Sequence, residues 1–309
     1  MATRDENKTP DVIRQLGEPA GETQNLDARI LLGDDMPLVL GGHTFIGQLG
    51  NEPRPTEDAQ CKIVETCLDN GIRWFDTTHR PERVALGKAL HRLGRRNEAV
   101  IIAWNFFDDV GADANDRLDG AAPYRPHHIA QLLEQLQTNF IDCLVVHPVA
   151  GGEAVNRAQL ELAVEWQKSG YVGVLGTWEP GEDAVERFGP ENPYDFMVRP
   201  LNVATPEAGP AFAAAKRLGW HTLAASPFVR GWHLDRLVAA ASKSWRGSES
   251  DLRRLLADHM LRYSLFHPNV DRVITAMRRV QWVVANVESV RRGPLTASER
   301  QWLDSILET

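Results

Sequence analysis

The sequence is poor in cysteine, with three among 309 residues. Cys61, Cys67 and Cys143 show no C-x-x-C spacing and lie within apolar segments that have a helix or strand pattern. So few cysteines exclude the disulfide framework that stabilises small secreted domains. A reducing cytoplasm is the expected compartment.

Long hydrophobic runs are also absent. No segment reaches the ~18 uninterrupted apolar residues of a membrane helix, and the first residues lack the apolar stretch of a secretory signal. Residues 1–28 are polar and interrupted by proline and glycine, so we expect a flexible N-terminal arm. Residues 29–309 are expected to form a single domain, because no break in composition follows the arm.

The sequence also has no excess of basic residues. Lysine and arginine number 34 against 42 acidic residues, which gives a net charge of −8. Nucleic acids and anionic membranes repel such a chain, so the expected partner is a small molecule. The sequence leaves the oligomeric state open.

Short apolar runs alternate along the chain with longer segments of helical periodicity. The runs predict strands at Pro37–Leu40, Trp74–Asp76, Val100–Ala103, Asp142–Val146, Val172–Leu175, Phe196–Val198, Thr222–Ala224 and Val273–Ile274. The segments between them predict helices at Thr56–Asn70, Arg83–Leu93, His127–Asn139, Ala158–Ser169, Pro206–Leu218 and Ser250–Leu265.

This alternation predicts an α/β fold, a closed (β/α)8 TIM barrel. An open doubly wound sheet is the alternative, but no G-x-G-x-x-G follows the first strand. The longest predicted loops, Phe106–Pro126 and Trp232–Glu249, would overhang the active-site face. Arg272, Arg291 and Arg292 are expected to be surface charges.

From about Leu31 onward the chain resembles the aldo/keto reductase superfamily. The resemblance is carried by six segments in order: NGIRWFDTT (70–78), VALGKAL (84–90), NFIDCLVVH (139–147), SGYVGVLG (169–176), ASPFVRG (225–231) and ITAMRRVQWVVAN (274–286). Each is weak alone, but their order and spacing are specific.

The resemblance implies a catalytic Asp at Asp76 and a catalytic His at His147. The family's proton-donating Tyr has no counterpart, because the segment is shorter and its position falls on His79 or Pro81. The family's Lys, at the end of the third strand, corresponds to Asn105, which carries no charge. Asp76, His147, His79 and Asn105 are therefore the candidate catalytic residues.

The resemblance also implies a site for NADP. The pyrophosphate and adenosine end is expected at Ser226, Pro227, Arg230, Gly231, Arg278, Arg279 and Asn286. Adjacent arginines suit a ribose 2′-phosphate. At the positions that hold the nicotinamide in the family, this chain has Trp178, Glu179 and Val198. It has Ala225 where the family usually has an aromatic residue that stacks on the nicotinamide ring. Trp178 is large enough to fill the nicotinamide space, so we expect it to point into the barrel mouth.

The substrate pocket is expected at His43, Trp104, Trp178 and Glu179, near the ends of other strands. Three functions follow. The first is a non-redox acid/base enzyme, such as a lyase, dehydratase or isomerase. The second is an NADP-dependent carbonyl reductase with an unusual proton donor, and the third is an inactive binding or regulatory protein. A metal-binding form of the first would use His43, Asp76, His79, His147 and Glu179, but they form no ligand motif, so no metal is predicted.

Overall fold

Eight parallel strands close into a barrel in which each strand pairs with its neighbours in the sequence and β8 pairs with β1. The computed structural model describes residues 36–47, 53–107, 120–189 and 192–307. The strands are β1 (Leu38–Leu40), β2 (Trp74–Thr77), β3 (Val100–Trp104), β4 (Ile141–Val146), β5 (Val172–Trp178), β6 (Phe196–Pro200), β7 (His221–Ala225) and β8 (Arg272–Thr275). The predicted closed barrel is confirmed, and the open sheet is excluded.

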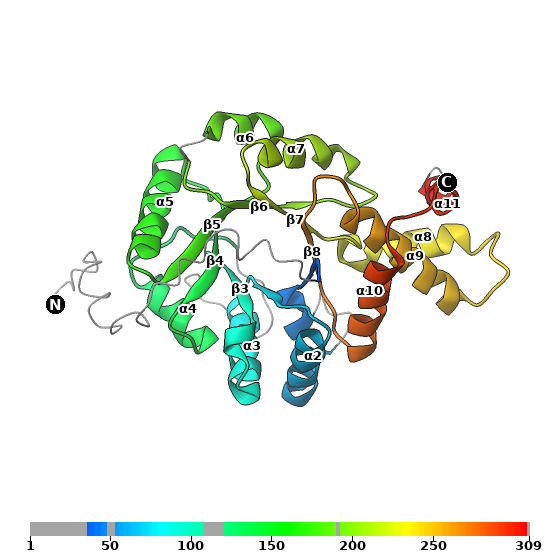
Figure 1. Ribbon diagram of the computed structural model, residues 1–309, viewed down its shortest axis with the longest axis horizontal. Coiled ribbons are helices and arrows are strands. Elements are labelled where there is room, and N and C mark those ends of the chain that lie inside the picture. Colours follow the sequence, from blue (N-terminus) through cyan, green and yellow to red (C-terminus); the bar gives the residue numbers. More distant parts are fainter. Residues whose placement is uncertain (1–35, 48–52, 108–119, 190–191, 308–309) are drawn as a thin grey trace.

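Helices surround the barrel on its outside (Figure 1). They are α2 (Glu57–Asp69), α3 (Arg80–Leu93), α4 (His128–Leu136), α5 (Glu153–Lys168), α6 (Glu182–Phe188), α7 (Gly209–Arg217), α8 (Trp232–Ala241), α9 (Glu249–Leu265), α10 (Val280–Arg292) and α11 (Ala297–Leu307). Short 3-10 turns are η1 (Gly42–Phe45), η2 (Arg96–Glu98), η3 (Pro206–Ala208) and η4 (Val229–Gly231). None of these described helices is long and apolar enough to cross a membrane.

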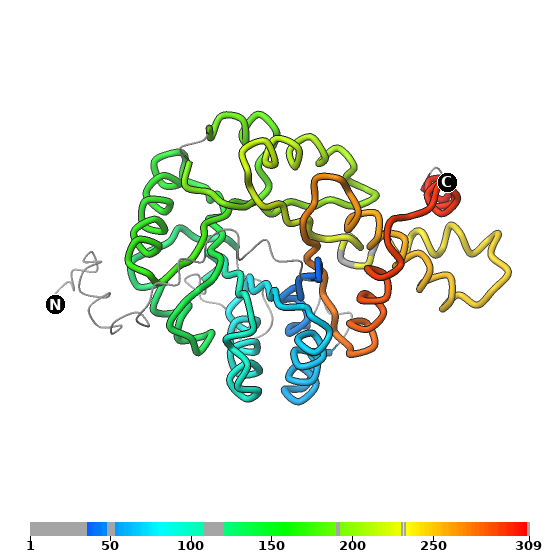
Figure 2. Tube along the Cα trace, in the orientation of Figure 1, coloured from blue at the N-terminus to red at the C-terminus, as the bar shows by residue number. Residues whose placement is uncertain are grey.

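The prediction of a loop over Trp232–Glu249 was wrong, because α8 occupies its first part. The trace in Figure 2 shows α8 and α9 extending outward beside the barrel, with α11 next to them. Leu237, Leu252 and Leu303, one from each helix, share a separate hydrophobic core. The predicted arm at residues 1–28 and most of the other predicted loop lie outside the described residues.

Strand alternation decides which side chains enter the barrel. Trp74 and Ile102 point inward and belong to the inner core, while Phe75 and Ala103 pack outward against the helices. By the same alternation Asp76 and Trp104 point inward at the carboxyl ends of β2 and β3, and Asn105 points outward. This alternation selects the side chains that meet at the barrel mouth.

Arg272 is not a surface charge as predicted. It is 4% exposed, and its guanidinium lies 4.6 Å from the centroid of the Trp74 ring at the amino-terminal end of the barrel. Its Nη1 donates to the Met36 carbonyl. The aromatic face and the carbonyl together compensate the burial of the charge.

The outer layer is close-packed where α3 crosses α4. A methyl group added at Gly87 would lie 2.7 Å from the Gln135 carbonyl oxygen and from the Leu136 backbone. Helix propensity alone would favour alanine over glycine by ~1 kcal/mol. The contact is with backbone, which cannot rotate away, so the clash outweighs the propensity.

We therefore expect Gly87→Ala to lower the free energy of unfolding by ~1–3 kcal/mol, as overpacking usually does. Urea unfolding monitored by tryptophan fluorescence measures it. The neighbouring Lys88→Ala, which removes an exposed ion pair with Glu57, is the control and should change stability by less than ~1 kcal/mol. A Gly87→Ala variant more stable than the parent chain would contradict this packing.

Candidate active site at the barrel mouth

Asp76 lies at the carboxyl end of β2 and is 6% exposed. The indole Nε1 of Trp104 donates a hydrogen bond of 2.6 Å to Asp76 Oδ1, and the backbone of Gly42 provides another. Burial, followed by the nearby carboxylate of Glu82, raises the pKa of Asp76 to about 7, although the indole bond opposes the rise. Asp76 can therefore give or take a proton near neutral pH.

The residue of β3 that faces Asp76 is Trp104. Asn105, which the family resemblance placed at the lysine position, is fully buried on the other side of the strand. Its Nδ2 donates to the carbonyls of Ala122 and His147, and its Oδ1 accepts from the backbone N–H of His147 at 2.8 Å. Asn105 therefore connects the ends of β3 and β4, and its amide contacts backbone groups and Gln159 rather than Asp76.

His147 follows β4 and is half-buried. Its Nδ1 lies 2.6 Å from the Pro148 carbonyl oxygen, which can only accept, so Nδ1 carries the proton and Nε2 is the basic nitrogen. Burial lowers the pKa of His147, although the carbonyl and the nearby Glu179 oppose the shift. The imidazole is consequently neutral at pH 7 and can act as a base.

Trp178 ends β5, is partly buried and packs against the inner core of the barrel. Its ring stacks on the His147 ring, with centroids 6.0 Å apart and an interplanar angle of 18°. It also makes an edge-to-face contact with the Trp104 ring, with centroids 5.2 Å apart. Phe106 completes this wall, with its ring 5.4 Å from His147. Glu179 has a left-handed backbone, with φ of 50°, and an exposed side chain. The aromatic wall is thus made of Trp104, Phe106, His147 and Trp178.

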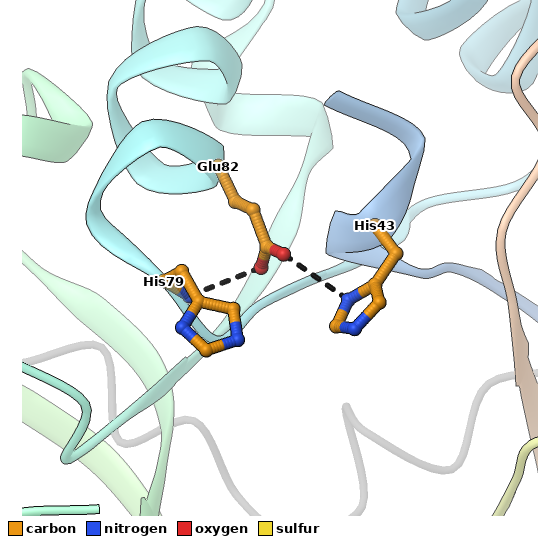
Figure 3. Close-up of side chains that lie close together, drawn as sticks. All are labelled: His43, His79 and Glu82. Atoms are coloured by element: carbon orange, nitrogen blue, oxygen red, sulfur yellow. Dashed lines mark hydrogen bonds and ion pairs between the residues drawn. The ribbon is translucent and has the colours of Figure 1, made fainter. Parts of the chain in front are cut away.

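A second cluster lies beside Asp76, where η1 meets the start of α3 (Figure 3). Glu82 is fully buried, and its Oε1 is 3.1 Å from Nδ1 of His43. Its Oε2 accepts the backbone N–H groups of Thr78 and His79. Burial acts to raise the pKa of Glu82, but the hydrogen bond and charge of His43 outweigh it and lower the pKa below its usual value.

Sequence reasoning missed Glu82. The usable signal was its place three residues after the N-cap His79, where a Glu closes a capping box. The position of the Glu82 carboxylate also depends on Gly42, because a Cβ at residue 42 would lie 2.2 Å from Glu82 Oε2. Glycine at position 42 therefore lets the backbone approach the buried carboxylate.

The residues predicted to bind a cofactor lie in the loops after β7 and β8 and on α10. Ser226 has φ of 57° and is exposed, and its carbonyl accepts from Asn202 Nδ2. Pro227 is buried. Gly231 has φ of 88°, and the side chain of Arg230 lies outside the described part of the chain.

The arginines of this region have other contacts. Arg278 is 7% exposed and its Nη2 donates to the Pro53 carbonyl. The guanidinium of Arg279 lies 5.2 Å from the centroid of the Trp282 ring. Asn286 is partly exposed on α10. Arg279 thus lies at the start of α10 and Asn286 near its middle. Arg278 instead binds the backbone of the segment at Pro53.

No family model and no curated protein matches the chain. Solved structures similar to it include an aldo-keto reductase from Bacillus halodurans in its holo form, with a TM-score of 0.64 and 21% identity over 88% of this chain and 92% of that chain. A protein from Pseudomonas aeruginosa assigned to the aldo-keto reductases has a TM-score of 0.61 and 17% identity over 84% and 90% of the two chains. The expected resemblance to aldo/keto reductases is thereby confirmed for the fold.

The raised pKa of Asp76 makes stability depend on pH. Its ordinary value is 3.8, so between pH 3.8 and about 7 the folded state binds more protons than the unfolded state. Stability therefore falls as pH rises through this window. The neutral Asp76→Asn avoids the cost and should be more stable than the parent chain by ~2–4 kcal/mol above pH 7, with a difference that shrinks toward pH 4.

Urea unfolding at a series of pH values measures this difference. Asp304→Asn, at an exposed aspartate, is the control and should show no such pH-dependent gain. An Asp76→Asn variant less stable than the parent chain at pH 8 would show that the buried carboxylate is compensated by other groups.

Proposed function

We propose that this protein is a non-redox acid/base enzyme, a lyase, dehydratase or isomerase, that acts on a small carbonyl or hydroxyl compound at the barrel mouth. The observation that carries the proposal is the Trp104 hydrogen bond to Asp76. It orients the carboxyl without bringing a positive charge, so burial and the nearby Glu82 carboxylate keep the pKa of Asp76 at about 7 and leave it a proton that it can donate. We also infer that the chain is a divergent member of the aldo/keto reductase superfamily.

Asp76 and His147 have complementary states at neutral pH. Asp76 is partly protonated, because its pKa is about 7, whereas the imidazole of His147 is neutral and basic at Nε2. The two lie on either side of Trp104, whose ring centroid is 6.3 Å from that of His147. Environments that hold two titratable groups in opposite states identify an acid and a base.

These roles give a simple first step. His147 Nε2 takes the proton from the carbon next to a substrate carbonyl, and Asp76 gives its proton to the carbonyl oxygen, which leaves an enol. From a 2-hydroxy carbonyl compound the enol is an enediol: His147 returns its proton to the former carbonyl carbon while the other hydroxyl gives its proton to Asp76, which yields the isomer. From a β-hydroxy carbonyl compound, protonated His147 gives its proton to the departing hydroxyl, which leaves as water, while the enol O–H returns its proton to Asp76, which yields the unsaturated carbonyl product. Neither route needs a hydride.

The second candidate is an NADP-dependent carbonyl reductase with His79 or water as proton donor. It is favoured by the holo form of the Bacillus halodurans structure. The left-handed loop at Ser226 and Arg279 near the start of α10 would serve the phosphates. Against this candidate, the described residues put the neutral Trp104 rather than a lysine beside Asp76, and Trp178 belongs to the wall where the nicotinamide would be held. An inactive binding protein is the third candidate.

The acid/base function is tested by proton exchange. Small 2-hydroxy aldehydes and ketones are incubated with the full chain in D2O without nucleotide, and proton NMR follows the signal of the carbon next to the carbonyl. We expect exchange, isomerisation or dehydration, reduced at least ~100-fold in Asp76→Asn because a positioned acid is lost. Asp304→Asn is the matched control and should keep the parent rate.

Absence of any such reaction over the panel would contradict the proposal. Robust oxidation of NADPH with a generic aldehyde would favour the reductase, and absence of both activities would favour the binding protein.

Trp178→Ser separates the first two candidates further. Replacing the indole by a hydroxyl removes bulk from the aromatic wall, so NADPH binding should appear or strengthen at least tenfold, roughly 1.4 kcal/mol. Isothermal titration calorimetry measures it, with Trp245→Ser in the separate core of α8, α9 and α11 as control. Unchanged or weaker affinity would show that Trp178 does not exclude the nicotinamide and would favour a working reductase.

A further inference from the structure

We propose that His43, His79 and Glu82 form a binding site for a divalent cation of the zinc type. The proposal does not rest on the acid/base function of Asp76 and His147, although the cluster lies beside Asp76. The three side chains converge from η1 and from the first turn of α3 (Figure 3). Within the described residues, one potential ligand atom from each lies within 4.8 Å of the other two.

The distances suit a tetrahedral ion. Two ligand atoms about 2.0–2.1 Å from zinc, at the tetrahedral angle, are about 3.3 Å apart. Nδ1 of His43 and Oε1 of Glu82 are 3.1 Å apart. The ligand atom of His79 lies within 4.8 Å of those of His43 and Glu82, so a bound ion would draw the His79 imidazole toward the other two side chains.

Glu82 is held in place for this role. The backbone N–H groups of Thr78 and His79 bind Oε2 at 2.7 and 3.1 Å, which fixes the carboxylate and leaves Oε1 toward His43. The backbone of Gly42 lies against the same carboxylate, because a Cβ at this position would be 2.2 Å from Oε2. Fixed outer contacts of this kind orient metal ligands and raise the affinity of a site.

The donor set selects the class of ion. Two imidazole nitrogens and one carboxylate oxygen are typical ligands of zinc and other borderline transition metals, whereas magnesium and calcium prefer oxygen ligands alone. Three protein ligands leave a fourth position for water or a substrate oxygen, which is the arrangement of catalytic rather than structural zinc sites. The 25% exposed side chain of His43 provides access from solvent.

A simpler role is an ion pair between His43 and Glu82 combined with the capping of α3. In that role Glu82 serves only the helix start and His79 is only the N-cap residue. The two roles differ in one measurable property, because only a metal site needs both imidazoles at once. The variants can therefore preserve the cap and remove the ligands.

The full chain is first treated with a chelator and then titrated with Zn²⁺ in competition with a chromophoric chelator. We expect one tight zinc per chain, no competition from Mg²⁺, and a higher melting temperature with zinc. Co²⁺ should give the visible absorption of a tetrahedral ion without the thiolate band that binding to Cys61, Cys67 or Cys143 would produce.

His79→Asn keeps a preferred N-cap residue, and His43→Gln keeps a donor for Glu82. Each should weaken zinc binding more than about 100-fold, because even changes outside the ligand shell cost about 10–100-fold. His91→Ala, at an exposed histidine on the same helix, is the control and should bind like the parent chain. Failure of the parent chain to bind stoichiometric zinc, or undiminished binding in both His variants, would overturn the site, and neither result bears on proton exchange by Asp76.

Discussion

The hydrogen bond between Trp104 and Asp76 is the interaction on which the site depends. It joins the ends of β2 and β3 inside the barrel, where the register pairs Asp76 with Ile102. An indole N–H orients the carboxyl but brings no formal charge, whereas a cation at this place would hold the carboxylate ionised. Burial therefore prevails over the indole bond and holds the pKa of Asp76 at about 7, which is the property on which the proposed chemistry depends.

The neighbouring carboxyl has the opposite environment. Glu82 is equally buried, yet it faces His43 and accepts two backbone N–H groups, so it is ionised. Its negative charge then contributes to the raised pKa of Asp76. The pKa values of the two carboxyls thus move in opposite directions, because Glu82 faces His43 and two backbone N–H groups whereas Asp76 faces the neutral indole of Trp104.

Much of the fold could be predicted because parallel strands give apolar runs between helical segments. The places of Asp76, His147 and Trp178 at strand ends followed from the same pattern. Asn105 was named as a candidate catalytic residue from its place in the resemblance, which does not fix the direction of the side chain; strand alternation turns it outward, where it contacts the His147 backbone. Glu82 and α8 were missed for another reason: a Glu near a helix start usually contacts solvent, and α8 is stabilised by packing on α9 and α11 that no local pattern reveals.

The aromatic wall links the acid, the base and the shape of the mouth. Trp178 and Phe106 cover His147 from two sides, and Trp104 lies between His147 and Asp76. Such apolar faces reduce the water near both groups, which strengthens electrostatic interactions between them and a bound substrate. Under the proposed function, Trp178 would have two effects: it would fill space that a nicotinamide needs, and it would help to create the apolar environment that proton transfer requires.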